Sequence, residues 1–177
     1  RGLDRIAAVL REYVAACLAA GADGFFFATQ LATDDLLTRD EYREFGVAYD
    51  LRVLESMQGR SRVTMLHLCK GSHLMVDLLE GYPVDALSWA HGTSQPSLTE
   101  VRRLTKKTLV TGVSLQTLHE GTELDVFAEA RTAIAEVGRT GFVLAPGCVI
   151  RATAANGNLR AMRCAVESDR HDGNFRA

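Results

Sequence analysis

The sequence places two thiols and one imidazole where they could share a metal ion. His67 and Cys69 end an apolar run, and strand side chains two positions apart point to the same side. Cys148 follows a later apolar run. Two thiolates and an imidazole fill three of the four positions around zinc and leave the fourth open, as in catalytic zinc sites. The pattern therefore predicts a zinc site made of His67, Cys69 and Cys148.

The same residue types also have a purely structural interpretation. Buried cysteines are common core residues, and a histidine on a strand often only makes a hydrogen bond. Cys17 and Cys164 lie on the apolar faces of predicted helices, and we interpret both as packing residues. The spacing of His67 and Cys69 alone leaves metal binding and core packing both open.

Five short apolar strands alternate with helices along the chain. Helical spacing of apolar residues and the capping pattern of Thr38 and Glu41 indicate the helices. The pattern predicts strands at 24–27, 63–68, 84–89, 109–113 and 141–145, and helices at about 3–20, 38–57, 74–79, from 97, 122–137 and 156–166. With no hairpin turns between them, the strands should form a parallel α/β sheet of right-handed βα units.

Composition narrows the possible partners. The chain has 177 residues, with 20 lysines and arginines against 22 aspartates and glutamates. No basic block appears, which argues against nucleic acid. No apolar run approaches the roughly 20 residues of a membrane span, and four cysteines are too few for a disulfide scaffold. We therefore expect a cytoplasmic protein.

Several motifs resemble, in order, the later part of the uroporphyrinogen decarboxylase superfamily. The resemblance spans nearly the whole chain. The motifs are Ala20-Gly21-Ala22-Asp23-Gly24-Phe25, Leu37-Thr38-Arg39-Asp40-Glu41-Tyr42-Arg43-Glu44-Phe45, His67-Leu68-Cys69-Lys70-Gly71, Ala86-Leu87-Ser88-Trp89, Leu144-Ala145-Pro146-Gly147-Cys148 and Asn158-Leu159-Arg160-Ala161-Met162.

This resemblance implies a TIM (β/α)8 barrel. Residues 1–166 would form its C-terminal five or so βα units, and residues 167–177 would form a loose polar tail. A barrel needs eight strands, and five would leave exposed pairing edges. We therefore expect missing N-terminal sequence, or strand pairing with another copy of the chain in a homo-oligomer.

Two branches of the superfamily differ at the site. The decarboxylase of haem synthesis has Gly-His-Gly where this chain has Gly147-Cys148-Val149. It also has an acidic residue and a serine in place of Thr29 and Gln30, and an aspartate in place of Ser88. The zinc methyltransferases instead use an H-x-C and a Gly-Cys, which match His67, Cys69 and Cys148. They pass a methyl group from a methylated corrinoid to the thiol of coenzyme M.

The resemblance to the second branch implies a zinc-dependent methyltransferase. Methylcobamide, free or on a corrinoid protein, would be the co-substrate, and a thiol would be the acceptor. Asp85 or Ser88 would orient His67, and Gln30, Ser88 and His91 are candidate substrate contacts. Two alternatives stay open: a decarboxylase-like enzyme acting on a tetrapyrrole, and a non-catalytic corrinoid- or tetrapyrrole-binding domain.

Overall fold

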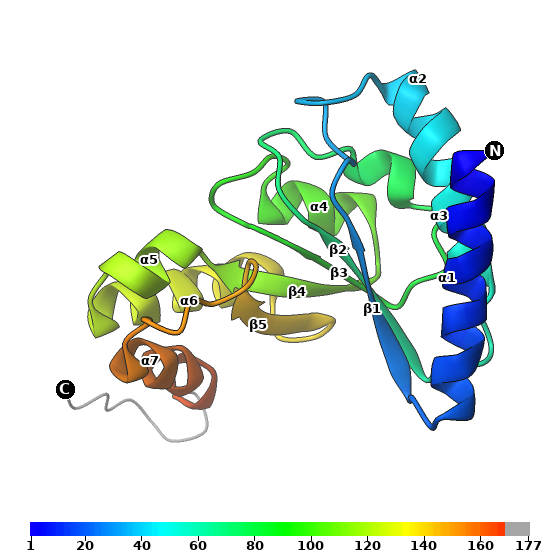
Figure 1. Ribbon diagram of the computed structural model, residues 1–177. Coiled ribbons are helices and arrows are strands. Elements are labelled where there is room, and N and C mark those ends of the chain that lie inside the picture. Colours follow the sequence, from blue (N-terminus) through cyan, green and yellow to red (C-terminus); the bar gives the residue numbers. More distant parts are fainter. Residues whose placement is uncertain (169–177) are drawn as a thin grey trace. The chain divides into compact units, whose positions relative to one another are not determined.

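A computed structural model describes residues 1–168, in which five strands alternate with helices (Figure 1). This arrangement confirms the predicted α/β class. In chain order the elements are α1 Gly2–Ala19, β1 Gly24–Thr29, α2 Arg39–Tyr42, the π-helical segment η1 Arg43–Val47, α3 Ala48–Glu55, β2 Val63–Leu68, the 3-10 turn η2 Val76–Leu79, β3 Ala86–Trp89, α4 Leu98–Leu104, β4 Thr108–Val113, α5 Leu115–Glu120, α6 Glu123–Val137, β5 Phe142–Pro146 and α7 Asn156–Glu167.

The strands form one sheet in the order β1-β2-β3-β4-β5. β1 pairs with β2 in parallel, with Ala28 opposite His67 and Thr29 opposite Leu68. β4 pairs with β5 in parallel, with Val113 opposite Pro146. Parallel neighbours that follow chain order are what successive right-handed βα units produce. The carboxyl ends of paired strands consequently lie at the same edge.

The first of two compact units comprises Arg1–Leu87. In it α1 packs against α3, and Arg52 of α3 donates to Asp4 of α1 at 2.8 Å (Figure 1). The predicted amphipathic helix is confirmed, but its buried residues are Ala7 and Val14. The other large apolar side chains of the predicted stripe lie roughly 40–160° around the helix from these two. They are exposed in the described structure: Ile6, Val9, Leu10 and Tyr13.

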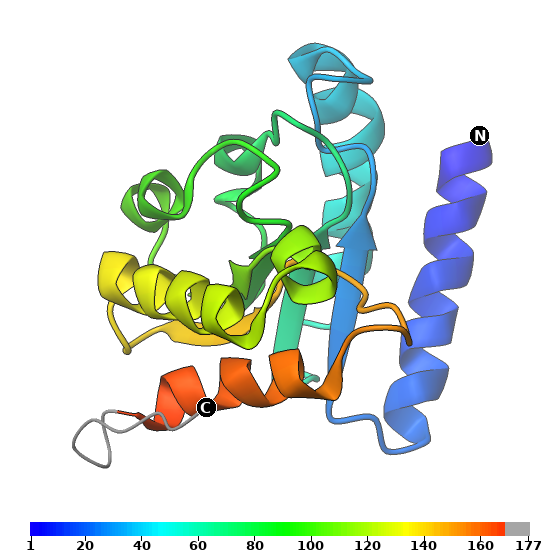
Figure 2. The same ribbon diagram turned by 90° about the vertical axis from the view of Figure 1, so that its left-hand side faces the viewer.

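The second unit begins at Ser88. Its helices α6 and α7 lie side by side (Figure 2). The predicted apolar positions Val126, Ala130 and Ile134 are buried, which confirms the interpretation of that helix. Val126 and Ala130 belong to a core formed by small and branched side chains from β4, α5, α6 and α7: Val113, Leu118, Val126, Ala130, Ala161 and Ala165.

Besides shifts of one or two residues at the ends of β1, β4 and β5, three predicted elements differ from those observed, and α5 was not predicted. The helix expected at 74–79 is a single 3-10 turn, because Gly81 and Pro83 follow at once and stop helical winding. The helix expected over 38–57 contains the π segment η1 and ends at Glu55. The strand expected at 84–89 begins at Ala86.

At the chain end, α7 runs through Glu167, one residue into the segment predicted as a tail. Residues 169–177 of that tail lie outside the described residues. No helix among residues 1–168 is both long enough and apolar enough to cross a membrane.

Asn158 connects α7 to the turn after α5 and offers a test of the second unit. Its buried Nδ2 donates to the carbonyls of Leu118 and Gly121, each at 2.9 Å. Asn158→Ala leaves both acceptors without this donor, so unfolding free energy should fall by about 1–3 kcal/mol. The exposed Asn156→Ala is the matched control and should change it by less than about 0.5 kcal/mol. Equal loss in both variants, measured by denaturant titration, would contradict this role.

Candidate metal centre

His67 is held at the end of β2 by its neighbours on β1. The side chain is 5% exposed, and its ring stacks on Phe26 with centroids 5.2 Å apart and planes at 28°. Phe26 lies two positions before Ala28, the residue opposite His67, so it shares that face of the sheet. Sequence reasoning missed Phe26, although its parity within the run Phe25-Phe26-Phe27 was the available signal.

Cys69 lies at the point where the chain leaves the sheet. Its backbone N–H donates to the carbonyl of Thr29 at 2.9 Å and extends the β1–β2 pairing by one step. The next residues turn sharply, with φ of 72° at Lys70 and 112° at Gly71. A left-handed φ costs a residue with a side chain roughly 1–2 kcal/mol. This turn leaves the Cys69 thiol half-buried at the strand end.

The turn after Cys69 is fastened to the segment after β1. A Cβ at Gly71 would lie 2.5 Å from Oγ1 of Thr33, so glycine allows the two segments to approach. Asp35 accepts a hydrogen bond from the Ser72 N–H and lies 3.4 Å from Nδ1 of His73. The Ser72 contact is the main cause that lowers the pKa of Asp35. Its carboxylate therefore stays charged, and keeps these contacts, at neutral pH.

Cys148 follows β5 and is positioned by the glycine before it. A Cβ at Gly147 would lie 2.5 Å from Cα of Ala90, and the Gly147 N–H donates to the carbonyl of Val113 at 3.2 Å. Any side chain at residue 147 would push this turn away from the chain after β3. Cys148 is half-buried.

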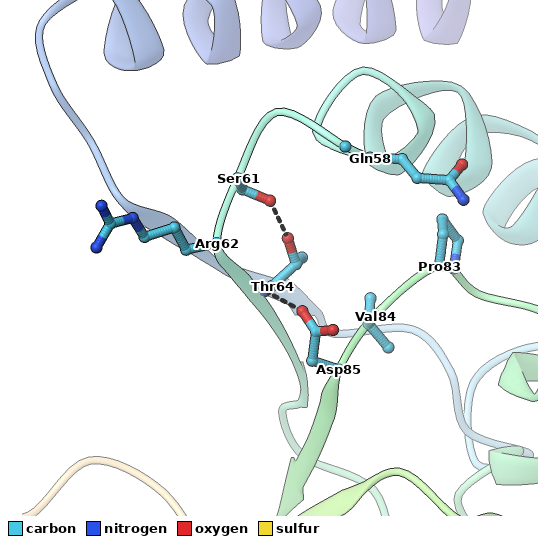
Figure 3. Close-up of a pocket in the computed structure, with 8 residues that line it drawn as sticks. Gln58, Ser61, Arg62, Thr64, Pro83, Val84 and Asp85 are labelled. Atoms are coloured by element: carbon cyan, nitrogen blue, oxygen red, sulfur yellow. Dashed lines mark hydrogen bonds between the residues drawn. The ribbon is translucent and has the colours of Figure 1, made fainter.

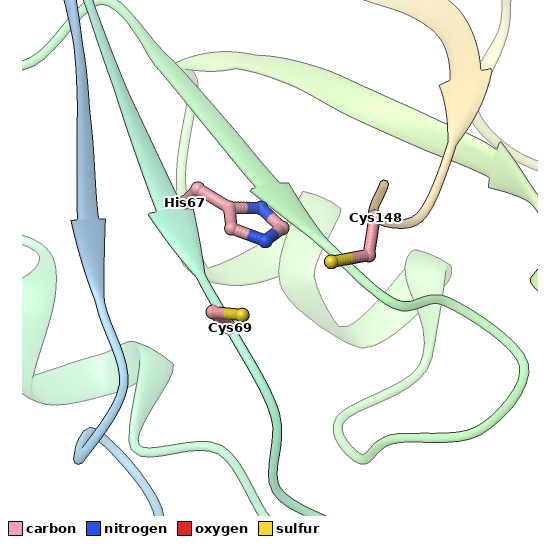
Figure 4. Close-up of side chains that lie close together, drawn as sticks. All are labelled: His67, Cys69 and Cys148. Atoms are coloured by element: carbon pink, nitrogen blue, oxygen red, sulfur yellow. The ribbon is translucent and has the colours of Figure 1, made fainter. Parts of the chain in front are cut away.

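The three predicted ligands gather as Figure 4 shows. One ligand atom from each of His67, Cys69 and Cys148 lies within 4.8 Å of the other two. Sulfur and nitrogen ligands around a tetrahedral zinc ion are roughly 3.5–3.8 Å apart. Small side-chain rotations would therefore give such a geometry. Two sulfurs and an imidazole suit zinc better than a hard cation such as magnesium.

The predicted substrate contacts have different environments. Gln30 is exposed and lies directly after the last residue of β1. Ser88 is buried within β3. His91 is half-buried, and its Nδ1 is enclosed without a hydrogen-bond partner among residues 1–168. Thr29, by contrast, turns its hydroxyl toward the helices and lies 3.2 Å from the hydroxyl of Tyr42.

Asp85 does not orient His67, which corrects one sequence-based expectation. Its carboxylate accepts from the Thr64 N–H at 2.7 Å at the beginning of β2 (Figure 3). His67 lies three residues further along that strand, about 10 Å away. Asp85 instead lines a polar cavity of about 280 Å³ between residues 58–64 and 83–85. That cavity is at the amino ends of β2 and β3.

Comparison with known proteins agrees with the motifs. Residues 1–168 match the family described as uroporphyrinogen decarboxylase (URO-D). The chain belongs to this family. No curated protein is similar enough to this URO-D family member to count as a match.

One solved structure is similar to this URO-D family member over almost its whole described length. It is a methyltransferase from Methanosarcina mazei, with a TM-score of 0.78 and 27% sequence identity. The similarity covers 93% of this chain and 47% of that one, so this chain spans about half the length of that structure. The five βα units are consequently a portion of a URO-D type barrel, as predicted.

Replacing Asp85 tests its assignment to the amino end of β2. Asp85→Ala should lower unfolding free energy by about 1 kcal/mol through loss of the bond to Thr64. Zinc affinity, measured by competition with a chromophoric chelator, should not change. Asp23→Ala, which removes an exposed ion pair with Arg62, is the control and should alter neither quantity measurably. A tenfold loss of zinc affinity in Asp85→Ala would restore Asp85 as a partner of His67.

Proposed function

We propose that this chain is part of a zinc-dependent methyltransferase that moves a methyl group from a methylated corrinoid to a thiol. The observation that carries the proposal is the cluster of His67, Cys69 and Cys148 at the ends of β2 and β5. Two soft donors and one imidazole are the ligand set of a catalytic zinc with an open position. Similarity to a methyltransferase structure supports the same reaction class.

Each protein group has a distinct role in this proposal. His67, Cys69 and Cys148 would hold zinc, which when bound lowers the pKa of a coordinated thiol and makes its thiolate available at neutral pH. Phe26 would keep the His67 ring in place through the stack. Gln30, Ser88 and His91 would contact the acceptor or the corrinoid.

The transfer itself balances without an oxidant or reductant. The acceptor thiol gives up its proton to solvent, and its sulfur forms a bond to the methyl carbon. The cobalt–carbon bond breaks, and its electron pair stays on cobalt. The protein must therefore bring the acceptor sulfur close to a methyl group presented by a bulky corrinoid. Orientation of this kind can account for several kcal/mol of the barrier.

A tetrapyrrole decarboxylase is the second candidate because the family as a whole carries that description. Cys148 would then occupy the place of the family histidine. Such a reaction requires no metal, so it gives no role to the three clustered ligand atoms. Metal binding therefore separates the two candidates.

Zinc binding is the first test. The chain should bind one zinc ion, and Cys148→Ser should weaken binding at least 100-fold, because it replaces a soft thiolate with a hydroxyl. His67→Ala and Cys69→Ser should have similar effects. Cys17→Ser and Cys164→Ser, at the two half-buried cysteines outside the cluster, are matched controls and should bind normally. Chelator competition gives the affinities, and absence of stoichiometric binding would refute the zinc site.

Methyl transfer is the second test. With zinc bound, the chain should convert methylcobalamin and a small thiol into a thioether, while the absorption of the methyl–cobalt bond disappears. Removal of zinc, or Cys148→Ser, should abolish the reaction, and Cys164→Ser should leave it unchanged. Binding of zinc without transfer to any of a panel of thiols would keep the metal site and reject the reaction.

A further inference from the structure

A largely buried network of hydrogen bonds lies behind β1 in the first unit. Tyr42 and Tyr82 donate to the same carboxylate oxygen of Asp50, at 3.0 and 2.9 Å. The Tyr42 hydroxyl also lies 3.2 Å from Oγ1 of Thr29. Both tyrosines are 1% exposed and Thr29 is 8% exposed. These hydrogen bonds thus join the last residue of β1, the helical segment that follows it and the segment before β3.

The direction of these bonds follows from the acceptor. A carboxylate has no proton to give, so the proton of each tyrosine points to Asp50. The Tyr42 oxygen can then only accept from the Thr29 hydroxyl. Burial is the main cause that raises the pKa of Asp50, whereas the two phenol donors oppose that shift. The orientation of Thr29 is therefore set by Asp50 through Tyr42.

The π-helical segment is what brings Tyr42 and Asp50 together. Eight residues of α-helix would leave their side chains about 80° apart around the axis. A π segment accommodates one extra residue in its turn, so the two side chains lie within about 20° of each other around the helix axis. The segment η1 lies between them. A Cβ at Gly46 would be 2.3 Å from the Tyr42 ring, so glycine lets the ring lie over the helix toward Asp50.

Thr29 connects this network to a proposed zinc ligand. Its hydroxyl belongs to the network, while its carbonyl accepts from the backbone N–H of Cys69 at 2.9 Å. That bond lies just before the left-handed turn at Lys70, beyond the last strand pair. We propose that Tyr42, Asp50 and Tyr82 are positioning residues that hold Thr29, and through it the Cys69 ligand; this inference rests on the proposed zinc site.

The carboxylate of Asp50 is partly buried, and such a group is a poor source of net stability, because the cost of removing it from water offsets much of the stabilisation from its hydrogen bonds. Its effect is therefore expected in geometry more than in unfolding free energy. Bonds that orient ligands from behind typically change metal affinity 10- to 100-fold when removed.

Tyr42→Phe is the central test, because it keeps the ring and removes the link between Asp50 and Thr29. We expect about tenfold weaker zinc binding and a changed thiolate-to-metal absorption band with Co²⁺ as the probe. The backbone N–H of Cys69 should exchange with solvent about tenfold faster in the metal-free protein, since its acceptor is less well held. Tyr49→Phe, in α3 with its ring against Arg52, is the matched control and should change none of these.

Thr29→Val removes the same link from the other side while keeping the side-chain shape. It should reproduce the effects of Tyr42→Phe. The double variant should bind zinc no more weakly than either single variant, because Thr29 and Tyr42 act through the same series of hydrogen bonds. Additive losses would mean that the two side chains act separately and would overturn the proposal.

The outcomes also separate this inference from the zinc proposal. If Tyr42→Phe lowers the melting temperature but leaves zinc affinity, the Co²⁺ spectrum and Cys69 exchange unchanged, the network is only structural and the inference is wrong. If the unaltered chain binds no zinc but Tyr42→Phe still accelerates Cys69 exchange, the zinc site fails while control of Cys69 by the network stands. If neither zinc binding nor the exchange effect is seen, both are wrong.

Discussion

The parallel pairing of β1 with β2 is the constraint on which the rest of this site depends. It puts Ala28 opposite His67, so Phe26 can stack on the imidazole, and it puts Thr29 beside the N–H of Cys69. A shift of one residue would turn His67 to the other face of the sheet. The register thus decides which face of the sheet the imidazole and the Cys69 thiol share.

Close backbone approach is the second constraint. Gly147 lies against Ala90, and Gly71 lies against Thr33, where a Cβ would meet atoms at 2.5 Å in each case. Gly147 directly precedes the proposed ligand Cys148, and Gly71 follows the proposed ligand Cys69 by two residues. Cys69 and Cys148 therefore extend from tight turns at strand ends, and neither is fully buried. Half-buried thiols at such turns remain accessible to a metal and to a substrate, which core cysteines do not.

The chemistry of the site and the family relationship support each other at different levels. Family membership establishes the barrel type but includes more than one reaction. Among the reactions of the family, the two sulfurs and one imidazole favour one that uses a metal ion. A decarboxylase that needs no metal would not require these ligands together. The buried network behind β1 adds a way to hold Cys69 that does not involve the substrate side of the sheet.

Much of this organisation could be predicted because it depends on local pattern. The periodicity of apolar residues indicated the five strands and most helices, and the two-residue spacing of His67 and Cys69 indicated a shared side. Cys148 was predicted from its position just after the last predicted strand, and the family resemblance then favoured metal binding over core packing. One ligand atom from each of the three residues does lie within 4.8 Å of the other two.

Tertiary structure decided the features that depend on register and on contacts between distant segments. Asp85 looked like a partner for His67, but its place just before β3 puts it beside Thr64, at the amino end of β2. The π segment was not predicted from the sequence, and the hydrogen bond between Tyr42 and Asp50 that accompanies it is visible only in the fold. Sequence by itself thus determined which residues could bind a metal. Only the fold decided what holds them, because hydrogen bonds such as that from Tyr82 to Asp50 join residues far apart in the chain.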